Sequence, residues 1–196
     1  MACGQHHIMT AELQHPIIIS TEDAYCGRFV HVVKDRLQWP DGRTQEYEKI
    51  IGKDGAIVVP FMPNGLVIMT AQYRHPVGKV LEQFVSGYVE DGEDPATAAA
   101  RELEEETGYQ APAGLIPLGR YPVEGGLSTK HNYMFMATLL TYTGKKNPDL
   151  LERKGMTMFE RESKRVYNDI IEGRHAEPIS AFAFLRAWHV LAKTMM

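Results

Sequence analysis

The sequence predicts an α+β fold, an α/β/α sandwich around a mixed sheet with an antiparallel β unit near its N-terminus. Segments rich in β-branched and aromatic residues follow one another along most of the chain. A single central segment carries helix-start and helix-stop signals, and the C-terminal part has the apolar periodicity of helices. Strands, one central helix and a helical C-terminus together are typical of this class.

The first predicted strands occupy residues 16–20, 28–39 and 43–51. Asp41-Gly42 separates the last two, and this dipeptide is a strong hairpin signal. We therefore divide the chain into a flexible N-terminus (1–15), an N-terminal β unit (16–51) and a main domain (52–196).

The main domain begins with two strands, 56–62 and 66–74, which flank a second hairpin signal at Asn64-Gly65. Further strands are expected at residues 79–87, 114–123, 132–142 and 155–160. Helices are expected at residues 163–173 and 179–193, because both segments carry an apolar stripe.

Asp94 and Pro95 begin the central helix, since Asp is a good N-cap and Pro suits the first helical position. Gly108 ends it. Small apolar residues recur at helical spacing and predict a closely packed buried stripe. This stripe comprises Ala96, Ala99, Ala100 and Leu103.

Glu102, Glu105 and Glu106 share another face of this helix, in its last turns. The helix dipole and the mutual repulsion of the carboxylates both oppose negative charge there. A bound divalent cation would remove both penalties, and hard oxygen ligands suit Mg²⁺ or Mn²⁺ better than zinc. The alternative is an ordinary solvated acidic face.

Composition excludes several classes of protein. The 196 residues carry a formal net charge of -4, which argues against a nucleic-acid partner or an anionic-membrane surface. No apolar run reaches the ~18 residues that a membrane span needs. The chain has two cysteines, too few for a disulfide framework, and no signal-peptide pattern, so we expect a cytoplasmic protein.

Residues 87–109 carry a fixed pattern of charges and glycines. Gly87 precedes Glu93 by five intervening residues, and seven more separate Glu93 from Arg101-Glu102. Glu105-Glu106 and Gly108 complete a pattern that resembles the Nudix box, with a soft departure at Tyr109, where the family usually has an aliphatic residue. The resemblance implies a Nudix fold and hydrolysis of a nucleoside diphosphate linked to another moiety.

The resemblance also implies roles for individual residues. Glu102, Glu105 and Glu106 would bind more than one Mg²⁺ or Mn²⁺ ion, together with the Ser86 carbonyl. Arg101 would orient the glutamates, and Glu93 would help to hold the box. Gly87 and Gly108 would be structural.

The resemblance extends beyond the box to the ADP-ribose pyrophosphatase and nucleoside-diphosphate-sugar hydrolase branch. In that branch the N-terminal β unit forms a homodimer and its aromatic residues stack on the base. Tyr47 is then the base-stacking candidate, ahead of Trp39 and Tyr25, although a half-buried strand tyrosine is the alternative. Arg74 would bind the substrate phosphates, unless it is a surface arginine. The similar segments are residues 39–42, 71–78, 82–93, 96–109, 119–137 and 169–188.

Two departures from the branch bear on specificity. Glu124 precedes Gly125 at a position where ADP-ribose enzymes usually have a proline. Gln83–Gly87 reads QFVSG where relatives read ELPAG. Both changes favour a broader or different nucleotide-sugar, with Glu124 and Gly125 in contact with it.

The general base that activates water is expected to be Glu152, in a loop after the last core strands. Glu160 and Glu162 are alternatives in the same region, and Glu105 is an alternative within the box. Two other functions remain open: a nucleotide-sugar-binding module that does not cleave its ligand, and a hydrolase of nucleoside triphosphates or dinucleoside polyphosphates. Retention of all the box glutamates favours an enzyme.

Overall fold

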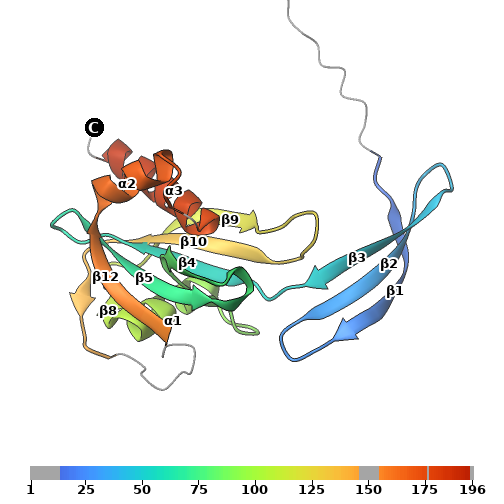
Figure 1. The fold of residues 1–196 in the computed structure, drawn as a ribbon, viewed down its shortest axis with the longest axis horizontal. Helices are drawn as coiled ribbons and strands as arrows, with labels where there is room; N and C mark the ends of the chain where they lie inside the picture. The colour runs from blue at the N-terminus through green and yellow to red at the C-terminus, as the bar shows by residue number, and fades with distance from the viewer. Residues whose placement is uncertain (1–13, 146–154, 176, 195–196) are drawn as a thin grey trace, which may run out of the picture. The chain divides into compact units, whose positions relative to one another are not determined.

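The computed structural model describes residues 14–145, 155–175 and 177–194. The chain folds as two compact units (Figure 1). The first contains the residues up to Gly52 and the short segment Gly126–Thr129, and the second contains Lys53–Gly125 and the residues from Lys130 onward. Most of the N-terminus that was predicted to be flexible (1–15), and the predicted general base Glu152, lie outside the described residues.

The first unit is an antiparallel sheet of order β1-β2-β3, formed by β1 (Ile17–Cys26), β2 (His31–Gln38) and β3 (Thr44–Ile51). Strand β1 is longer than the predicted segment 16–20. The extension carries acidic residues that the sequence pattern disfavours in a strand. Cross-strand pairs compensate for this, because Lys34 Nζ lies 2.7 Å from Glu22 Oε1 and His31 Nε2 lies 2.6 Å from Asp23 Oδ1.

A polar cluster lies within this sheet. Asp35 is 3% exposed and accepts hydrogen bonds from Thr21 Oγ1 (2.6 Å) and from Lys49 Nζ. The Lys49 side chain holds the pKa of Asp35 below its ordinary value, with a further contribution from Thr21. Gly126–Thr129 joins the sheet beside β3, where Ile50 N donates to Leu127 O (2.8 Å).

The core of the second unit is a mixed sheet of order β7-β4-β10-β9. Strand β10 (His131–Ala137) is parallel to β4 (Gly55–Pro60) and antiparallel to β9 (Ile116–Pro122). Strand β7 (Val85–Tyr88) is antiparallel to β4. The α+β class and the mixed sheet predicted from the sequence are therefore confirmed.

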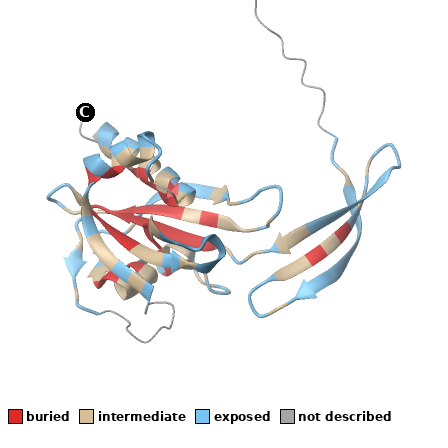
Figure 2. Ribbon diagram, viewed as in Figure 1, coloured by how far each residue is buried: buried red, intermediate tan, exposed pale blue. Residues whose placement is uncertain are grey.

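Helices cover both faces of this sheet (Figure 1). Ala56 and Val58 of β4 pack in a cluster with α1 (Pro95–Thr107), whereas Ile57 and Val59 pack in a cluster with α2 (Ser163–Ile171) and α3 (Pro178–Thr194). Alternate residues of a strand point to opposite faces, so β4 is apolar throughout because both faces are buried. Figure 2 shows this concentration of buried residues on the central strands.

The second unit also contains a three-stranded sheet of order β12-β5-β6. Its strands are antiparallel: β12 (Met156–Glu162), β5 (Leu66–Arg74) and β6 (Lys79–Gln83). A short 3₁₀ helix (His75–Val77) joins β5 to β6. The remaining pair is β11 (Thr141–Tyr142) with β8 (Tyr109–Gln110).

The single strand predicted at residues 79–87 is wrong, because β6 and β7 belong to different sheets. The chain changes sheets at Phe84, which is fully buried. Its backbone N–H donates to Ser180 Oγ of α3 (3.0 Å) instead of to a neighbouring strand. The strand predicted at 132–142 is likewise divided, at Leu139, whose φ of 53° breaks the extended backbone.

The buried face of α1 also differs from the predicted stripe. Ala99 and Leu103 are buried as expected, but Ala100 is exposed and Ala98 is fully buried. The helix is therefore rotated toward Ala98, and Thr107 extends its buried face to the last turn. None of the described helices is long and apolar enough to cross a membrane.

Candidate functional site

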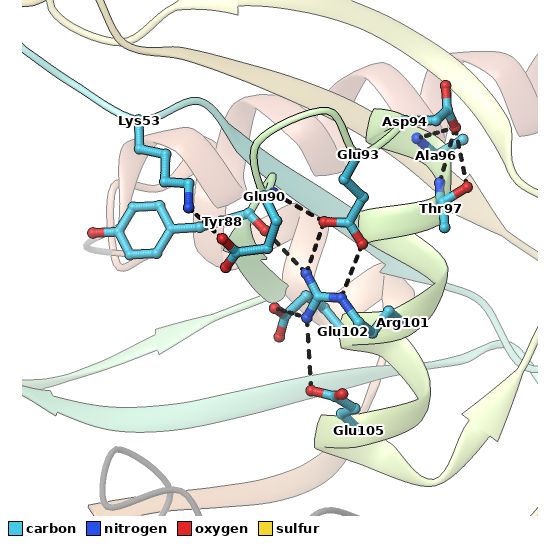
Figure 3. Close-up of polar contacts among 10 residues, drawn as sticks. All are labelled: Lys53, Tyr88, Glu90, Glu93, Asp94, Ala96, Thr97, Arg101, Glu102 and Glu105. Atoms are coloured by element: carbon cyan, nitrogen blue, oxygen red, sulfur yellow. Dashed lines mark hydrogen bonds and ion pairs between the residues drawn. The ribbon is translucent and has the colours of Figure 1, made fainter.

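Helix α1 is fixed at both ends by its own sequence. Asp94 Oδ1 accepts hydrogen bonds from Ala96 N and Thr97 N, both at 3.0 Å (Figure 3). Gly108 ends the helix with φ 77°, and its N–H donates to Glu104 O (2.7 Å). The left-handed conformation at this position favours glycine. These caps set the register in which the glutamates are presented.

Arg101 is the centre of the site's polar network (Figure 3). Its Nε and Nη2 donate to the two carboxylate oxygens of Glu93 at 3.0 and 3.1 Å, while Nη1 donates to Glu102 Oε1 at 2.6 Å. Nη2 also donates to the Tyr88 carbonyl of β7 (3.1 Å), and Nη1 lies 3.7 Å from Glu105 Oε2. The guanidinium therefore joins the loop before α1, the helix itself and β7.

The charges in this network stabilise one another. The pKa of Arg101 is raised above its ordinary value, and the hydrogen bond to the Glu93 carboxylate is the largest cause. In return the Arg101 guanidinium holds the pKa of Glu93 below its ordinary value, helped by the Glu90 N–H, which donates to Glu93 Oε2 at 2.9 Å. The network therefore favours the charged form of Glu93.

A cavity of about 690 Å³ opens beside α1 within the second unit. Glu102, Glu105 and Glu106 line it together with Ser86 and Gly87 of β7. The predicted metal-ligand set is thus gathered at one wall of one cavity. The acid comes from the helix, and the backbone carbonyl candidate comes from the adjacent strand.

Gly87 makes the close approach of helix and strand possible. A Cβ at this position would overlap the carboxylate of Glu102. The chemistry of the donors, three carboxylates and a carbonyl, suits a hard divalent cation. As the side chains stand, the described residues contain no group of three or more His, Cys, Asp or Glu arranged to hold a metal.

Cationic residues also line the cavity. Arg74, at the end of β5, donates from Nε and Nη2 to Gln83 Oε1 at 3.1 and 2.8 Å. Lys130 lines the same cavity, and its Nζ lies 5.3 Å from the centre of the Tyr88 ring. Burial, and next the charge of Arg74, lowers the pKa of Lys130.

Sequence reasoning missed Lys130, Asn132, Glu177 and Ser180, all of which line the cavity. Glu177 accepts hydrogen bonds from Ile179 N (3.1 Å) and Ser180 N (2.5 Å), so it caps α3. The acidic residue before Pro178 was the signal that could have predicted this cap. Lys130 and Asn132 carry no comparable local signal.

Other predicted site residues lie elsewhere. Tyr47 belongs to the first unit, where its hydroxyl donates to the Gly126 carbonyl, and Trp39 Nε1 donates to Gln45 Oε1 (3.2 Å). Glu124 and Gly125 are exposed, although Val123 lines the cavity and the Glu124 charge acts on Lys130. Among the described alternatives for the base, Glu105 lines the cavity, whereas Glu160 and Glu162 are exposed and do not.

The second unit is thus an α/β/α domain in which an acidic helix lines a cavity. Comparison with known proteins assigns this domain to a family. The Nudix domain model matches residues 53–163. That match covers more than half of the chain, so the chain belongs to the Nudix family. A crystal structure of an ADP compounds hydrolase superposes with a TM-score of 0.81 over 93% of this chain and 97% of that one, at 21% identity, which supports the fold.

Two curated relatives are similar over shorter stretches. The methanol dehydrogenase activator of Bacillus methanolicus is 41% identical over 47% of this chain and 50% of its own length. The ADP-ribose pyrophosphatase of Bacillus subtilis is 30% identical over 63% of this chain and 66% of its own length. The chain thus spans between half and two thirds of the length of these relatives, and the similarity extends to an ADP-ribose pyrophosphatase.

Proposed function

We propose that this protein hydrolyses the pyrophosphate bond of a nucleoside diphosphate sugar, ADP-ribose or a nucleoside diphosphate hexose, to a nucleoside monophosphate and a sugar phosphate. The observation that carries this proposal is one cavity lined by Glu102, Glu105 and Glu106 from α1 and by Arg74 and Lys130 from other elements. The ADP-ribose pyrophosphatase relative supports the substrate class.

The carboxylates and the Ser86 carbonyl would hold Mg²⁺ or Mn²⁺, more than one ion per site. Such ions lower the pKa of a bound water and offset charge on the leaving phosphate. Arg101 orients Glu102 by a charge-assisted hydrogen bond and anchors it to β7 and Glu93. Arg74 and Lys130 bind the anionic pyrophosphate, whose charge the glutamates would otherwise repel. Glu105 is the described candidate for the base that takes a proton from water, beside the proposed Glu152.

A ligand-binding module without activity is the alternative from another class. The described site retains all three box glutamates and the Arg101 network that orients them, which favours hydrolysis. A hydrolase of nucleoside triphosphates or dinucleoside polyphosphates would share this machinery but needs no contacts to a sugar.

A panel of ADP-ribose and ADP-, GDP- and UDP-hexoses, assayed with Mg²⁺ and with Mn²⁺, tests the proposal. The expected products are a nucleoside monophosphate and a sugar phosphate, identified by chromatography. ATP and a dinucleoside polyphosphate in the same panel test the alternative substrates. Binding of nucleotide-sugars without turnover under either metal would instead establish the non-catalytic module.

Glu124 provides a finer test of the sugar. Proline would fix the loop backbone at this position, whereas Glu leaves it free and adds a hydrogen-bond acceptor suited to sugar hydroxyls. A hexose offers more hydroxyls than the linked ribose, so hexose substrates should be hydrolysed at least as well as ADP-ribose. Glu124→Pro should shift the kcat/KM ratio toward ADP-ribose by roughly tenfold, the worth of one or two hydrogen bonds. A strong preference of wild type for ADP-ribose would count against this role of Glu124, as would an unchanged kcat/KM ratio in Glu124→Pro.

A further inference from the structure

Lys130 immediately precedes β10, and its backbone is held there from two sides. The Lys130 carbonyl accepts a hydrogen bond from Val123 N, just after β9 (3.0 Å). The N–H of the next residue, His131, donates to Asp54 Oδ1 at 2.8 Å. Both polar groups of the peptide between Lys130 and His131 are therefore bonded, which fixes the plane of this peptide. That plane sets the direction in which the Lys130 side chain leaves the backbone.

Asp54 takes the place of a neighbouring strand in this arrangement. The parallel pairing of β4 with β10 begins at Gly55↔Asn132, one residue farther along each strand. At Asp54 the acceptor is a side-chain oxygen, while its backbone carbonyl accepts from Val89 N, just after β7 (3.0 Å). Asp54 thus joins the start of β10 to the end of β7.

The end of β7 also contacts the Lys130 ammonium. Lys130 Nζ lies 5.3 Å from the centre of the Tyr88 ring, within the range of a cation–π attraction. Tyr88 and Lys130 both line the cavity. Because Tyr88 is next to Val89 in the chain, Asp54 is bonded beside both the backbone of Lys130 and the ring that its ammonium meets.

The carboxylate of Asp54 is itself fixed by basic neighbours. Arg120 Nη2 of β9 lies 3.5 Å from Asp54 Oδ2, and His131 Nδ1 lies 3.7 Å from Asp54 Oδ1. The Arg120 guanidinium also lies over the Tyr133 ring of β10, with Cζ 5.4 Å from the ring centre. The negative charge of Asp54 is therefore held at one place, beside the start of β10.

The charges around Lys130 act on its ammonium in opposite directions. Burial lowers the pKa of Lys130 most, and the charge of Arg74 lowers it further. Three carboxylates oppose this and raise the pKa, with Asp54 the largest cause, followed by Glu124 and Glu177. Glu124 is exposed, and Glu177 is hydrogen-bonded to the backbone at the start of α3. Asp54 therefore combines the largest opposing charge with a hydrogen bond to the peptide that follows Lys130.

We propose that Asp54 is a positioning residue for Lys130, which holds the start of β10 and supplies the negative charge beside which the Lys130 ammonium stays protonated in the cavity. This inference rests on the proposed function for the identity of the anion that Lys130 binds. Asp54 is not among the residues that line the cavity. Its charge can therefore support the cation without standing in the cavity wall that an anionic substrate meets.

The first experiment measures the protonation of Lys130 directly. Protein with isotope-labelled lysine is titrated by NMR without metal or substrate, and Lys130→Met assigns the signal. Asp54→Asn keeps an oxygen that can accept from His131 N but removes the charge, so the midpoint of the Lys130 titration should move to lower pH. Asp91→Asn is the matched control, because Asp91 is exposed and does not line the cavity. An unchanged midpoint in Asp54→Asn, or an equal change in Asp91→Asn, overturns the inference.

The second experiment asks whether Asp54 acts through Lys130. Hydrolysis of ADP-ribose with Mg²⁺ is measured for Asp54→Ala, Lys130→Met and the double variant, and thermal melting checks that each variant folds. Asp54→Ala removes both the acceptor and the charge, so KM should rise about tenfold, with a smaller change in kcat. Lys130→Met and the double variant should have the same KM, because Asp54 then has no cation left to position.

Two kinetic results would overturn the inference. One is a KM for Asp54→Ala within about twofold of wild type, and the other is a full additional effect of Asp54→Ala in the Lys130→Met background. If Asp54→Ala does not fold, Asp54→Asn decides. Its KM should rise more steeply with pH than the KM of wild type, because a lower pKa of Lys130 removes the ammonium at lower pH. Equal pH dependence of the two KM values contradicts the proposed role.

Failure of the proposed function gives a different result. In that case wild type hydrolyses no nucleoside diphosphate sugar under either metal. The NMR titration needs no substrate, so it still decides whether Asp54 keeps Lys130 protonated.

Discussion

Glu105 and Glu106 lie where negative charge destabilises a helix, although they belong to the candidate site. Both lie in the last turns of α1 and line the cavity, where the helix dipole opposes their charge. Arg101, which lies 3.7 Å from Glu105, reduces the repulsion only in part. The site is therefore built from groups that the isolated helix would not favour.

We expect Glu105→Gln or Glu106→Gln to remove nearly all turnover and leave the fold intact, because the reaction needs the metal that these carboxylates would hold. Thermal stability without metal should hold or rise, since one repulsive charge is lost. Addition of Mn²⁺ should then stabilise wild type more than either variant in a thermal melt.

Glu104→Gln is the matched control for these variants. Glu104 lies on the same helix, does not line the cavity and accepts a hydrogen bond from Thr143 Oγ1 (3.0 Å). Turnover by the Glu104→Gln variant should stay near that of wild type. Near-wild-type turnover of both Glu105→Gln and Glu106→Gln at saturating Mg²⁺ would refute the metal-site assignment.

Glu93→Gln should destabilise the protein by about 2 kcal/mol at neutral pH, because it replaces a charge-assisted bidentate pair with Arg101. The folded-state pKa of Glu93 is lowered below its ordinary value of 4.5. Its stabilising contribution is thus present above pH 4.5 and is lost as pH falls through the lower folded-state value.

Urea denaturation at a series of pH values checks this prediction. The difference in the free energy of unfolding between wild type and Glu93→Gln should narrow steadily below pH 4.5. A difference that stays constant across the acid range would show that the Glu93 charge does not carry the effect.

At the scale of elements, the site depends on a change of sheet at Phe84. Strand β6 carries Gln83, which holds Arg74, and β7 carries Ser86 and Gly87 beside α1. The one residue between them donates its backbone N–H to Ser180 Oγ. Helix α3 therefore holds the backbone at Phe84, where the chain leaves β6 and enters β7.

Ser180→Ala should cost about 1–2 kcal/mol of stability, because it leaves the buried Phe84 N–H without its acceptor. Chemical denaturation measures this loss. Thr157→Ala, which removes an exposed hydroxyl in β12, is the control and should change stability by less than about 0.5 kcal/mol. An equally small change in stability for Ser180→Ala would mean that another group accepts the hydrogen bond from the Phe84 N–H.

At the scale of the whole molecule, the first unit exposes an apolar surface that is large for its small sheet. Ile17, Ile18 and Ile19 of β1 are 62%, 57% and 50% exposed, and Tyr25 is 60% exposed. Val33 is the one described residue of this sheet that is both apolar and buried. Exposed apolar strands at a sheet edge favour association with a partner.

We expect a homodimer formed in part through residues 16–51, detected by light scattering at micromolar concentration. Ile17→Asp combined with Ile19→Asp, or Ile18→Asp alone, places charge at exposed apolar positions of β1. At least one of the two should shift the protein toward monomer. A wild-type monomer, or a dimer that neither variant weakens, would contradict the prediction.

The elements that could be predicted from the sequence are those whose signals are local. Asp94, Pro95 and Gly108 specify both ends of α1, and the spacing of Glu102, Glu105 and Glu106 places three carboxylates on one face. The continuous apolar run of β4 likewise agrees with a strand buried on both faces. These features could be predicted because caps and periodicity act within a few residues.

The distant residues that complete the site could not be predicted, because long-range packing brings them together. Nothing near Phe84 in the sequence signals a strand break, because the acceptor of its N–H comes from α3. Lys130, Asn132 and Glu177 join the cavity for the same reason: separate elements bring them there. Gln83 could be recognised as unusual in its segment, but its contact with Arg74 depends on the register of β5 and β6, a long-range pairing that no local pattern determines.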